Sequence, residues 1–158
     1  MADTAIGSVS SADASSRVCV KLHPQLPTMV IPDGVAAQLE IDIAPAPVPN
    51  TKPWLKGVLN LRGNLVPVFD IGLWFGLPAL ESDSALIVAP GTAALGVLCA
   101  EAPTLSVVKA GRDLDPADPM LGIASRRYDG ADGPNYELDL PAWVSSVGSR
   151  LSGREATP

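Results

Sequence analysis

Hydrophobic and polar positions follow their clearest pattern in Trp54–Leu77, WLKGVLNLRGNLVPVFDIGLWFGL. Two apolar runs, Trp54–Leu61 and Leu65–Phe69, flank the three-residue connector Arg62-Gly63-Asn64. Glycine and asparagine tolerate the positive φ values that tight hairpin loops require. The segment therefore predicts a β-hairpin, and it places one cation at an otherwise apolar tip.

The residues that follow the hairpin predict a short helix. Asp70 stands in the N-cap position ahead of the amphipathic run Ile71–Phe75, which ends at Gly76 and Pro78. Capping accounts for Asp70 without any catalytic role. The predicted unit of hairpin, cap and helix exposes Arg62 and supplies no reaction chemistry.

Elsewhere the chain predicts short strands separated by turns. The strands expected from alternating or apolar runs are Arg17–Leu22, Thr28–Ile31, Ser84–Ala89, Ala94–Ala100, Leu105–Val108, Met120–Ser125 and Tyr136–Leu138. Residues 35–43 alternate as a strand toward their end but also suit a helical turn at their start. Residues 44–53 hold four prolines and predict an extended connector, and residues 109–119 predict a loop. Asp139 predicts the cap of a last helix, which ends at about Leu151.

The two halves of the chain repeat one another weakly. Leu55-Lys56-Gly57-Val58 matches Met120-Leu121-Gly122-Ile123, and the Asp70 and Asp139 caps are each followed four positions later by a tryptophan, Trp74 or Trp143. The second copy has a longer turn, Tyr128–Pro134. The repeat suggests two similar small β-barrels.

Composition narrows the class of protein. The 158 residues include 16 prolines and 14 glycines but few aromatics, which favours an all-β barrel or sandwich. The net charge of −6 argues against non-specific nucleic-acid binding, and the longest apolar stretch is too short for a membrane span. Residues 1–16 and 152–158 are predicted to be flexible tails around a domain at 17–151. Cys19 and Cys99 are expected to be buried free thiols of a cytoplasmic protein.

Candidate chemistry in the sequence is sparse. His23 is the only histidine and is interpreted as a lone surface residue, so that a hydrolytic triad or a two-histidine metal site is not possible. Asp113, Asp115 and Asp118 do not form a calcium loop, because Asp118 stands where an EF-hand requires glycine. The sequence predicts no metal and no cofactor, and the tryptophans are expected in the core or a groove wall. A hydrolase whose carboxylates are gathered by folding stays open as an alternative.

The residues Lys56–Ile71 carry a resemblance to a known family. The stretch KGVLNLRGNLVPVFDI resembles the signature of the CheW-like adaptors, G-V-x-N-L-R-G-x-x-V-P-V-x-D-L, at nearly every position. Looser resemblance extends from about Val18 to Leu151. The proline-rich run before Trp54 is similar to the branch associated with type IV pilus motility. His23–Pro27 and Ser125–Asn135 depart from the family pattern.

The resemblance implies an all-β fold of two intertwined five-stranded SH3-like barrels, with short helices after each Asp cap. It implies a non-catalytic adaptor that couples chemoreceptors to a chemotaxis histidine kinase. The groove and hairpin would face the cytoplasmic tip of the receptor, and the far end of the second barrel would dock the kinase's CheW-like regulatory domain. The partner-binding residues carried over are Val35, Ala36, Gln38, Asn60, Leu61, Arg62 and Gly63. Family members often have glutamate where Gln38 stands, and Glu40 takes that role if the register slips.

Two simpler interpretations accompany these residues. Arg62 is either a solvated turn residue or a guanidinium that grips a partner carboxylate. Asn60 is most simply a structural amide held by a hydrogen bond. A stand-alone peptide-binding barrel outside chemotaxis is the alternative function.

Overall fold

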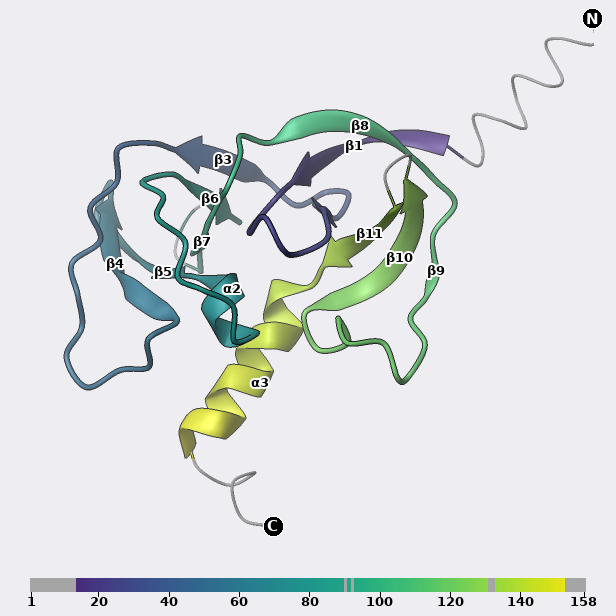
Figure 1. The fold of residues 1–158 in the computed structure, drawn as a ribbon. Helices are drawn as coiled ribbons and strands as arrows, with labels where there is room; N and C mark the ends of the chain where they lie inside the picture. Colours follow the sequence, from purple (N-terminus) through teal and green to yellow (C-terminus); the bar gives the residue numbers. More distant parts are fainter. Residues whose placement is uncertain (1–13, 90, 92, 131–132, 153–158) are drawn as a thin grey trace, which may run out of the picture.

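The computed structural model describes residues 14–152 except 90, 92, 131 and 132, and these form two β-sheets with two helices between them (Figure 1). The six-stranded sheet contains, in spatial order, β8 (Thr104–Lys109), β1 (Ala14–Val20), β2 (Met29–Val30), β11 (Gly133–Leu138), β10 (Ala124–Gly130) and β9 (Arg112–Asp113). The five-stranded sheet contains β3 (Ala37–Glu40), β6 (Ala85–Val88), β7 (Leu95–Leu98), β5 (Asn64–Phe69) and β4 (Leu55–Leu61). The helices are α2 (Ile71–Trp74) and α3 (Leu140–Ser152).

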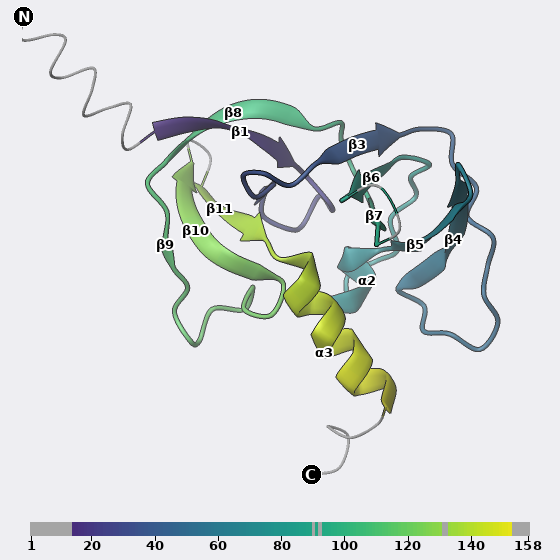
Figure 2. The ribbon, with the colours of Figure 1, turned by 180° about the vertical axis from the view of Figure 1, so that it is seen from behind.

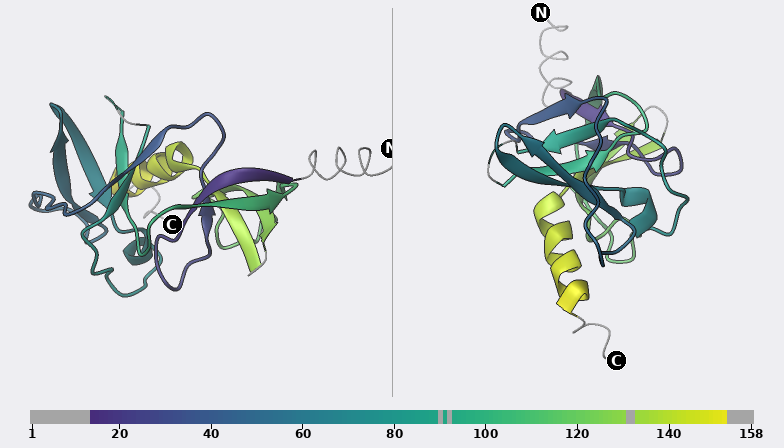
Figure 3. Two further views of the ribbon diagram at one scale, coloured as in Figure 1. Left: turned by 90° about the horizontal axis from the view of Figure 1, so that it is seen from above. Right: turned by 90° about the vertical axis from the view of Figure 1, so that its left-hand side faces the viewer.

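The two sheets repeat one topology. In the order β3-β6-β7-β5-β4 the pair β5·β7 is parallel, and in β8-β1-β2-β11-β10 the corresponding pair β11·β2 is parallel. β1 and β2 thus belong to the sheet whose other members come from the C-terminal half. The predicted all-β fold of two intertwined halves is confirmed, and β9 adds a sixth strand to the second half. Seen from above, the halves lie side by side with α3 between them (Figure 3).

Hydrogen bonds at the two caps show the internal repeat. The Asp70 amide donates to the Trp54 carbonyl over 2.8 Å, and the Asp139 amide donates to the Ile123 carbonyl over 2.7 Å. Ile123 is therefore the counterpart of Trp54. The predicted match of Gly57 with Gly122 is wrong, because Gly122 lies in the turn before β10 rather than in a strand.

An aromatic cluster joins the two halves at their helices. Trp143 of α3 is 1% exposed and stacks edge-on against Trp74, Trp54 and Phe69, with ring centroids 5.3, 6.0 and 4.8 Å away. Trp143 thus lies in the core, and the half-buried Trp54 and Trp74 pack against it, which agrees with the predicted core or groove-wall position. Because Trp54, Trp74 and Phe69 come from the first half and Trp143 from the second, these ring contacts join the two barrels. Figure 2 shows α3 crossing in front of α2 at this junction.

Several predicted boundaries are wrong in the second half. The expected strand Met120–Ser125 is mainly a turn, and the expected turn Tyr128–Pro134 lies mostly within β10 and β11. β10 shows little alternation of apolar and polar residues, because it contains several charged residues and its buried positions include Tyr128 instead of aliphatic side chains. Residues 109–119 are a loop interrupted by β9. Residues 14–16, predicted as tail, begin β1, whereas 1–13 and 153–158 lie outside the described residues.

His23 is buried, and its interpretation as a surface residue is wrong. Only 4% of it is exposed, its Nδ1 accepts from the Gln25 amide over 3.1 Å, and its Nε2 lies 2.9 Å from the Pro78 carbonyl. A carbonyl only accepts, so the proton resides on Nε2. The ring packs directly over Gly72 of α2, where a Cβ would collide with it. Because Gly72 has no side chain, the imidazole of His23 fits against α2.

The two cysteines match their prediction. Cys19 and Cys99 are both free and buried. Burial raises the pKa of the Cys99 thiol to about 11, so that it stays protonated at neutral pH.

Gly57 lets the proline-rich connector approach β4. It has φ +148°, and a Cβ built on it would lie 2.5 Å from the Ala46 carbonyl oxygen, which pairs with Val58. We expect Gly57→Ala to lower the free energy of unfolding by about 1–3 kcal/mol through strain and this clash. Thermal unfolding measures it. Gly148→Ala in α3 is the control, since a Cβ there meets nothing within 4 Å; equal stability of the two variants would contradict the prediction.

Candidate functional site

The β4–β5 hairpin builds an exposed tip around Arg62. Leu61 pairs with Asn64, so the loop is the two residues Arg62 and Gly63, with φ 51° and 87°, rather than the predicted three-residue connector. Two successive positive φ values are typical of a type I′ turn, which matches the twist of the strands. The Asn60 side-chain oxygen accepts from the Gly63 amide over 2.9 Å, which makes Asn60 the structural amide that the sequence suggested.

A small hollow brings part of the predicted site together. Gln38 of β3, Leu61, Arg62 and Asn64 of the hairpin and Gly91 of the β6–β7 turn line a space of about 50 Å³. Gln38 donates to the Glu40 carboxylate over 2.9 Å. Gln38 and Glu40 are two positions apart in β3, where they pair with Ile87 and Ala85 of β6, so their side chains point to the same side of the strand. The register therefore places both an amide and a carboxylate on the side of β3 that faces the Arg62 hollow.

Two predicted residues lie apart from this hollow. Val35 and Ala36 precede β3, and neither lines it. The Ala36 carbonyl accepts from the Ala89 amide over 2.8 Å, whereas Val35 packs against the core. Of the predicted partner-binding set, the structure gathers Gln38, Leu61 and Arg62, while Asn60 and Gly63 shape the turn that presents them.

A larger groove lies on the other side of β3 and was missed from the sequence. It has a volume of about 730 Å³, and its walls include Leu39 and Ile41 on one side and Ala100 and Ala102 on the other. Leu39 and Ile41 are 38% and 63% exposed. Their alternation predicts a strand but does not predict that this side of it is exposed. Burial depends on what covers a strand, which local alternation does not reveal.

The corresponding strand of the second barrel carries a matching exposed pair. Leu39 pairs with Leu86 as Leu105 pairs with Val18, which makes Leu105 the counterpart of Leu39 and Val107 that of Ile41. Leu105 and Val107 are 74% and 67% exposed. β3 and β8 both run along the upper side of the molecule in Figures 1 and 2, and we call their exposed apolar residues Leu39, Ile41, Leu105 and Val107 the apolar strip. Exposed apolar groups gathered in this way are typical of an interaction surface.

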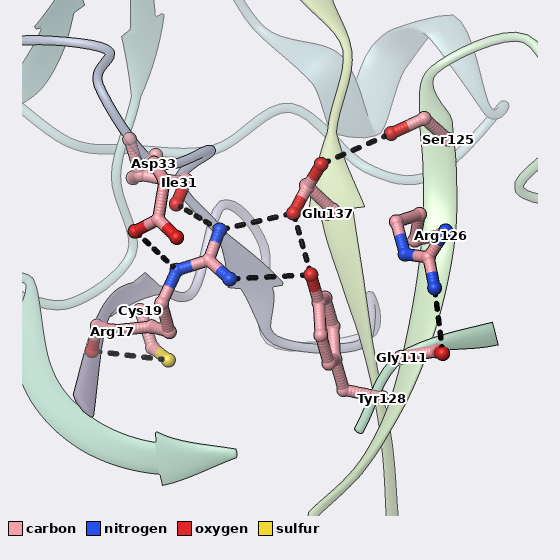
Figure 4. Close-up of polar contacts among 9 residues, drawn as sticks. All are labelled: Arg17, Cys19, Ile31, Asp33, Gly111, Ser125, Arg126, Tyr128 and Glu137. Carbon is pink, nitrogen blue, oxygen red and sulfur yellow. Dashed lines mark hydrogen bonds and ion pairs between the residues drawn. The ribbon is translucent and has the colours of Figure 1, made fainter. Parts of the chain in front are cut away.

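A buried polar network inside the second barrel was also missed (Figure 4). Arg17, 7% exposed, donates to the Ile31 carbonyl and to Glu137, each over 2.9 Å, and to the Tyr128 hydroxyl over 3.2 Å. The Tyr128 hydroxyl donates to Glu137 over 2.7 Å, and the Arg17 Nε lies 3.3 Å from Asp33. The members come from β1, β10 and β11 and from the loop after β2. No local pattern could have found a cluster so dispersed in sequence.

The network shifts the titration of its members. Burial alone would raise the pKa of Glu137, but the hydrogen bonds from Tyr128 and Arg17 hold it below its ordinary value. Burial raises the pKa of Tyr128, and its bond to Glu137 raises it further. Glu137 is therefore the anion that neutralises buried Arg17. The arrangement is a satisfied structural pair, because every charged group in it has a partner.

Reaction chemistry is not evident in the part of the chain that the structure describes. Among those residues no group of three or more histidine, cysteine or acidic side chains could hold a metal ion. Within the same residues no helix has the length and apolar character needed to cross a bilayer. The site consists of an exposed cation, a polar pair on β3 and an apolar strip, which together are suited to binding.

Comparison with known proteins identifies the fold and the family. The fold is similar to that of the scaffolding protein TtCheW from Thermoanaerobacter tengcongensis, with a TM-score of 0.63 and 18% identity over 79% of this chain and 90% of that chain. No curated protein matches the chain. The model of the CheW-like domain matches residues 26–111, which include β3, the Arg62 hairpin and β8. The chain belongs to the CheW-like domain family.

Proposed function

We propose that this protein is a non-catalytic, cytoplasmic adaptor of a bacterial chemosensory system. It couples the cytoplasmic tip of a chemoreceptor to a chemotaxis histidine kinase. The observation that carries the proposal is the meeting of Gln38, Leu61 and Arg62 at one hollow, with exposed apolar side chains on the opposite side of β3. Membership of a scaffold family supports the adaptor role.

The receptor-binding surface combines a charge with apolar area. Arg62 is exposed at a two-residue turn, where its guanidinium can form a bidentate contact with a carboxylate of the receptor. Leu39 and Ile41, on the opposite side of β3 from the hollow, offer apolar surface for a helical hairpin. The charge fixes the orientation of the bound receptor, and the apolar groups supply buried interface area. A modest interface suffices when many adaptors act together in an array.

The kinase would bind a different surface, on the second barrel. The two hairpins differ in charge: the register makes Asp129 the counterpart of Asn60, and Asp129 faces Arg112 over 3.4 Å near the tip of β10–β11. The two barrels therefore offer unlike surfaces to two partners. We propose the CheW-like regulatory domain of the kinase as the second partner, and pilus motility as the output.

The Arg62 contact is tested by charge reversal. We expect Arg62→Glu to weaken binding of a receptor cytoplasmic fragment by about 10- to 100-fold, the loss of a charge-assisted bond, with unchanged thermal unfolding. Isothermal titration calorimetry with the purified fragment measures it.

Lys52→Glu on the exposed connector is the matched control, because it makes the same change of charge away from the hollow. If both variants weakened receptor binding equally, the loss would come from the change in net charge and not from a contact made by Arg62. Full binding by Arg62→Glu would refute the proposed contact. A kinase pull-down distinguishes the adaptor from a peptide-binding module outside chemotaxis, which would not retain the regulatory domain.

A further inference from the structure

The large groove beside β3 is lined by three segments of the chain, all of which the structure describes. Leu39 of β3 and Ile41 just after it form one wall, and Ala100 and Ala102 after β7 form the other. Residues 80–84, which precede β6, complete the lining of this space of about 730 Å³. Because small alanines stand opposite the two larger side chains, the groove has room for apolar side chains of a partner.

Hydrogen bonds between these segments fix the shape of the groove before a partner binds. The Ile43 amide donates to the Asp83 carbonyl over 2.9 Å, which joins the end of β3 to the segment before β6. The Cys99 amide donates to the Ser84 carbonyl over 2.9 Å, and the Ser82 hydroxyl donates to the Cys99 carbonyl over 2.7 Å. A partner therefore meets backbone that is already ordered, which lowers the cost of binding.

The charged residues that line the groove are all acidic. They are Glu81, Asp83 and Glu101, which we call the acidic rim, and all three are exposed. Within the described residues, none of these carboxylates forms an ion pair or a side-chain hydrogen bond. Lys21 lines an adjacent hollow that also reaches Glu101, but it makes no ion pair with that carboxylate. An apolar groove thus carries uncompensated negative charge at its edge.

Such a surface selects its partner by charge as well as by apolar area. Acidic side chains at the edge of a partner would meet like charges at the acidic rim, whereas lysine or arginine there would form charge-assisted contacts. Both basic side chains can also lay their aliphatic stems along an apolar wall while the charged end stays in water. The hollow on the opposite side of β3 presents the cation Arg62, so the two sides of β3 favour opposite charges on what they bind.

We propose that this groove binds an amphipathic helix of a partner protein, whose apolar face is bordered by lysine or arginine. The helical form rests on the proposed function, in which Leu39 and Ile41 meet a helical hairpin of the receptor. The charge that this helix carries is the new element, and it follows from the acidic rim.

The test is an NMR titration of the ¹⁵N-labelled full chain with three capped peptides of about 18 residues, long enough to form a helix. The first peptide has leucine and alanine along one face and lysine on both borders of that face. The second has glutamate in place of lysine, and the third is a scrambled form of the first without an apolar face. We expect saturable shifts of the Leu39, Asp83 and Ala102 amides with the first peptide, and binding at least about 10-fold weaker with the others.

Three variants tie the binding to the walls and to the acidic rim. Glu81→Gln with Asp83→Asn removes two charges from the rim and should weaken binding of the lysine peptide about fivefold. Asp113→Asn with Asp115→Asn removes two exposed charges outside the groove and should bind like the parent chain. Ile41→Ser removes an apolar side chain from the wall and should weaken binding about 10-fold.

The outcomes separate this inference from the proposed function. Absence of shifts at the groove, equal binding of either other peptide, or equal weakening by the two double variants would each overturn it. The peptides contain no receptor sequence, so their binding does not depend on a receptor contact at Arg62. If a receptor fragment shifted the Leu61 and Arg62 amides while the lysine peptide left the groove unchanged, the inference would fail and the proposed function would stand.

Discussion

Replacing Trp143 by alanine is expected to lower the free energy of unfolding by about 3–5 kcal/mol. The side chain is 1% exposed and contacts three aromatic rings that all belong to the first barrel, so its removal opens a cavity at the junction of the two barrels. Chemical denaturation followed by circular dichroism measures the change.

Two further variants define the origin of this effect. Trp143→Phe should retain much of the stability, because the indole Nε1 makes no hydrogen bond in the structure. Val144→Ala, one position along α3 and 39% exposed, should change stability by less than about 1 kcal/mol. If Trp143→Ala were no more damaging than Val144→Ala, the aromatic cluster would not hold the barrels together.

The second large effect is expected from Glu137→Ala. The variant leaves the Arg17 guanidinium, 7% exposed, without its buried carboxylate, and removal of one partner from such a pair typically costs about 3–5 kcal/mol. Asp33, the other acid beside Arg17, is 87% exposed. Asp33→Ala should therefore cost less than about 1 kcal/mol.

The physical cause can be separated by removing both charges. A double variant, Arg17→Leu with Glu137→Leu, should be more stable than Glu137→Ala alone, because no unpaired charge stays buried. Equal stabilities of the single and double variants would contradict the account.

The same carboxylate gives stability a pH dependence. The pKa of Glu137 is lower in the folded chain than in the unfolded one, so the unfolded chain takes up its proton first as the pH falls. The stabilisation by ionised Glu137 is complete above the pKa range of ordinary carboxylates, near pH 4–5. It is lost as the pH falls through the lower pKa that Glu137 has in the folded chain. Denaturation midpoints measured from pH 7 to pH 3 should fall more steeply in the parent chain than in Glu137→Gln.

Local signals in the sequence were enough to predict the first barrel's hairpin. Alternation, turn residues and the Asp70 cap agree there, and the structure differs only in the loop, where Arg62 rather than Asn64 takes the positive φ. The second hairpin was misplaced because β10 carries charged and small residues, so its period is weak. Turn chemistry alone did not locate its ends.

Other features depend on contacts that are distant in sequence. Arg17 and Glu137 lie 120 positions apart, and their positions separately give no sign that both are buried. His23 similarly lies directly before Pro24, in a segment that predicts an exposed turn, yet α2 packs against it at Gly72. The apolar strip was visible as alternation, but nothing in the pattern of β3 alone shows that no layer covers it.

The central claim, that the Arg62 hairpin and β3 bind the receptor, is tested most directly by mapping the contact. The measurement is an NMR titration of the ¹⁵N-labelled chain with the cytoplasmic hairpin of its chemoreceptor. We predict saturable shifts centred on the amides of Gln38, Leu61 and Arg62. Shifts confined to β10 and β11, or none at all with a receptor fragment of intact helicity, would contradict it.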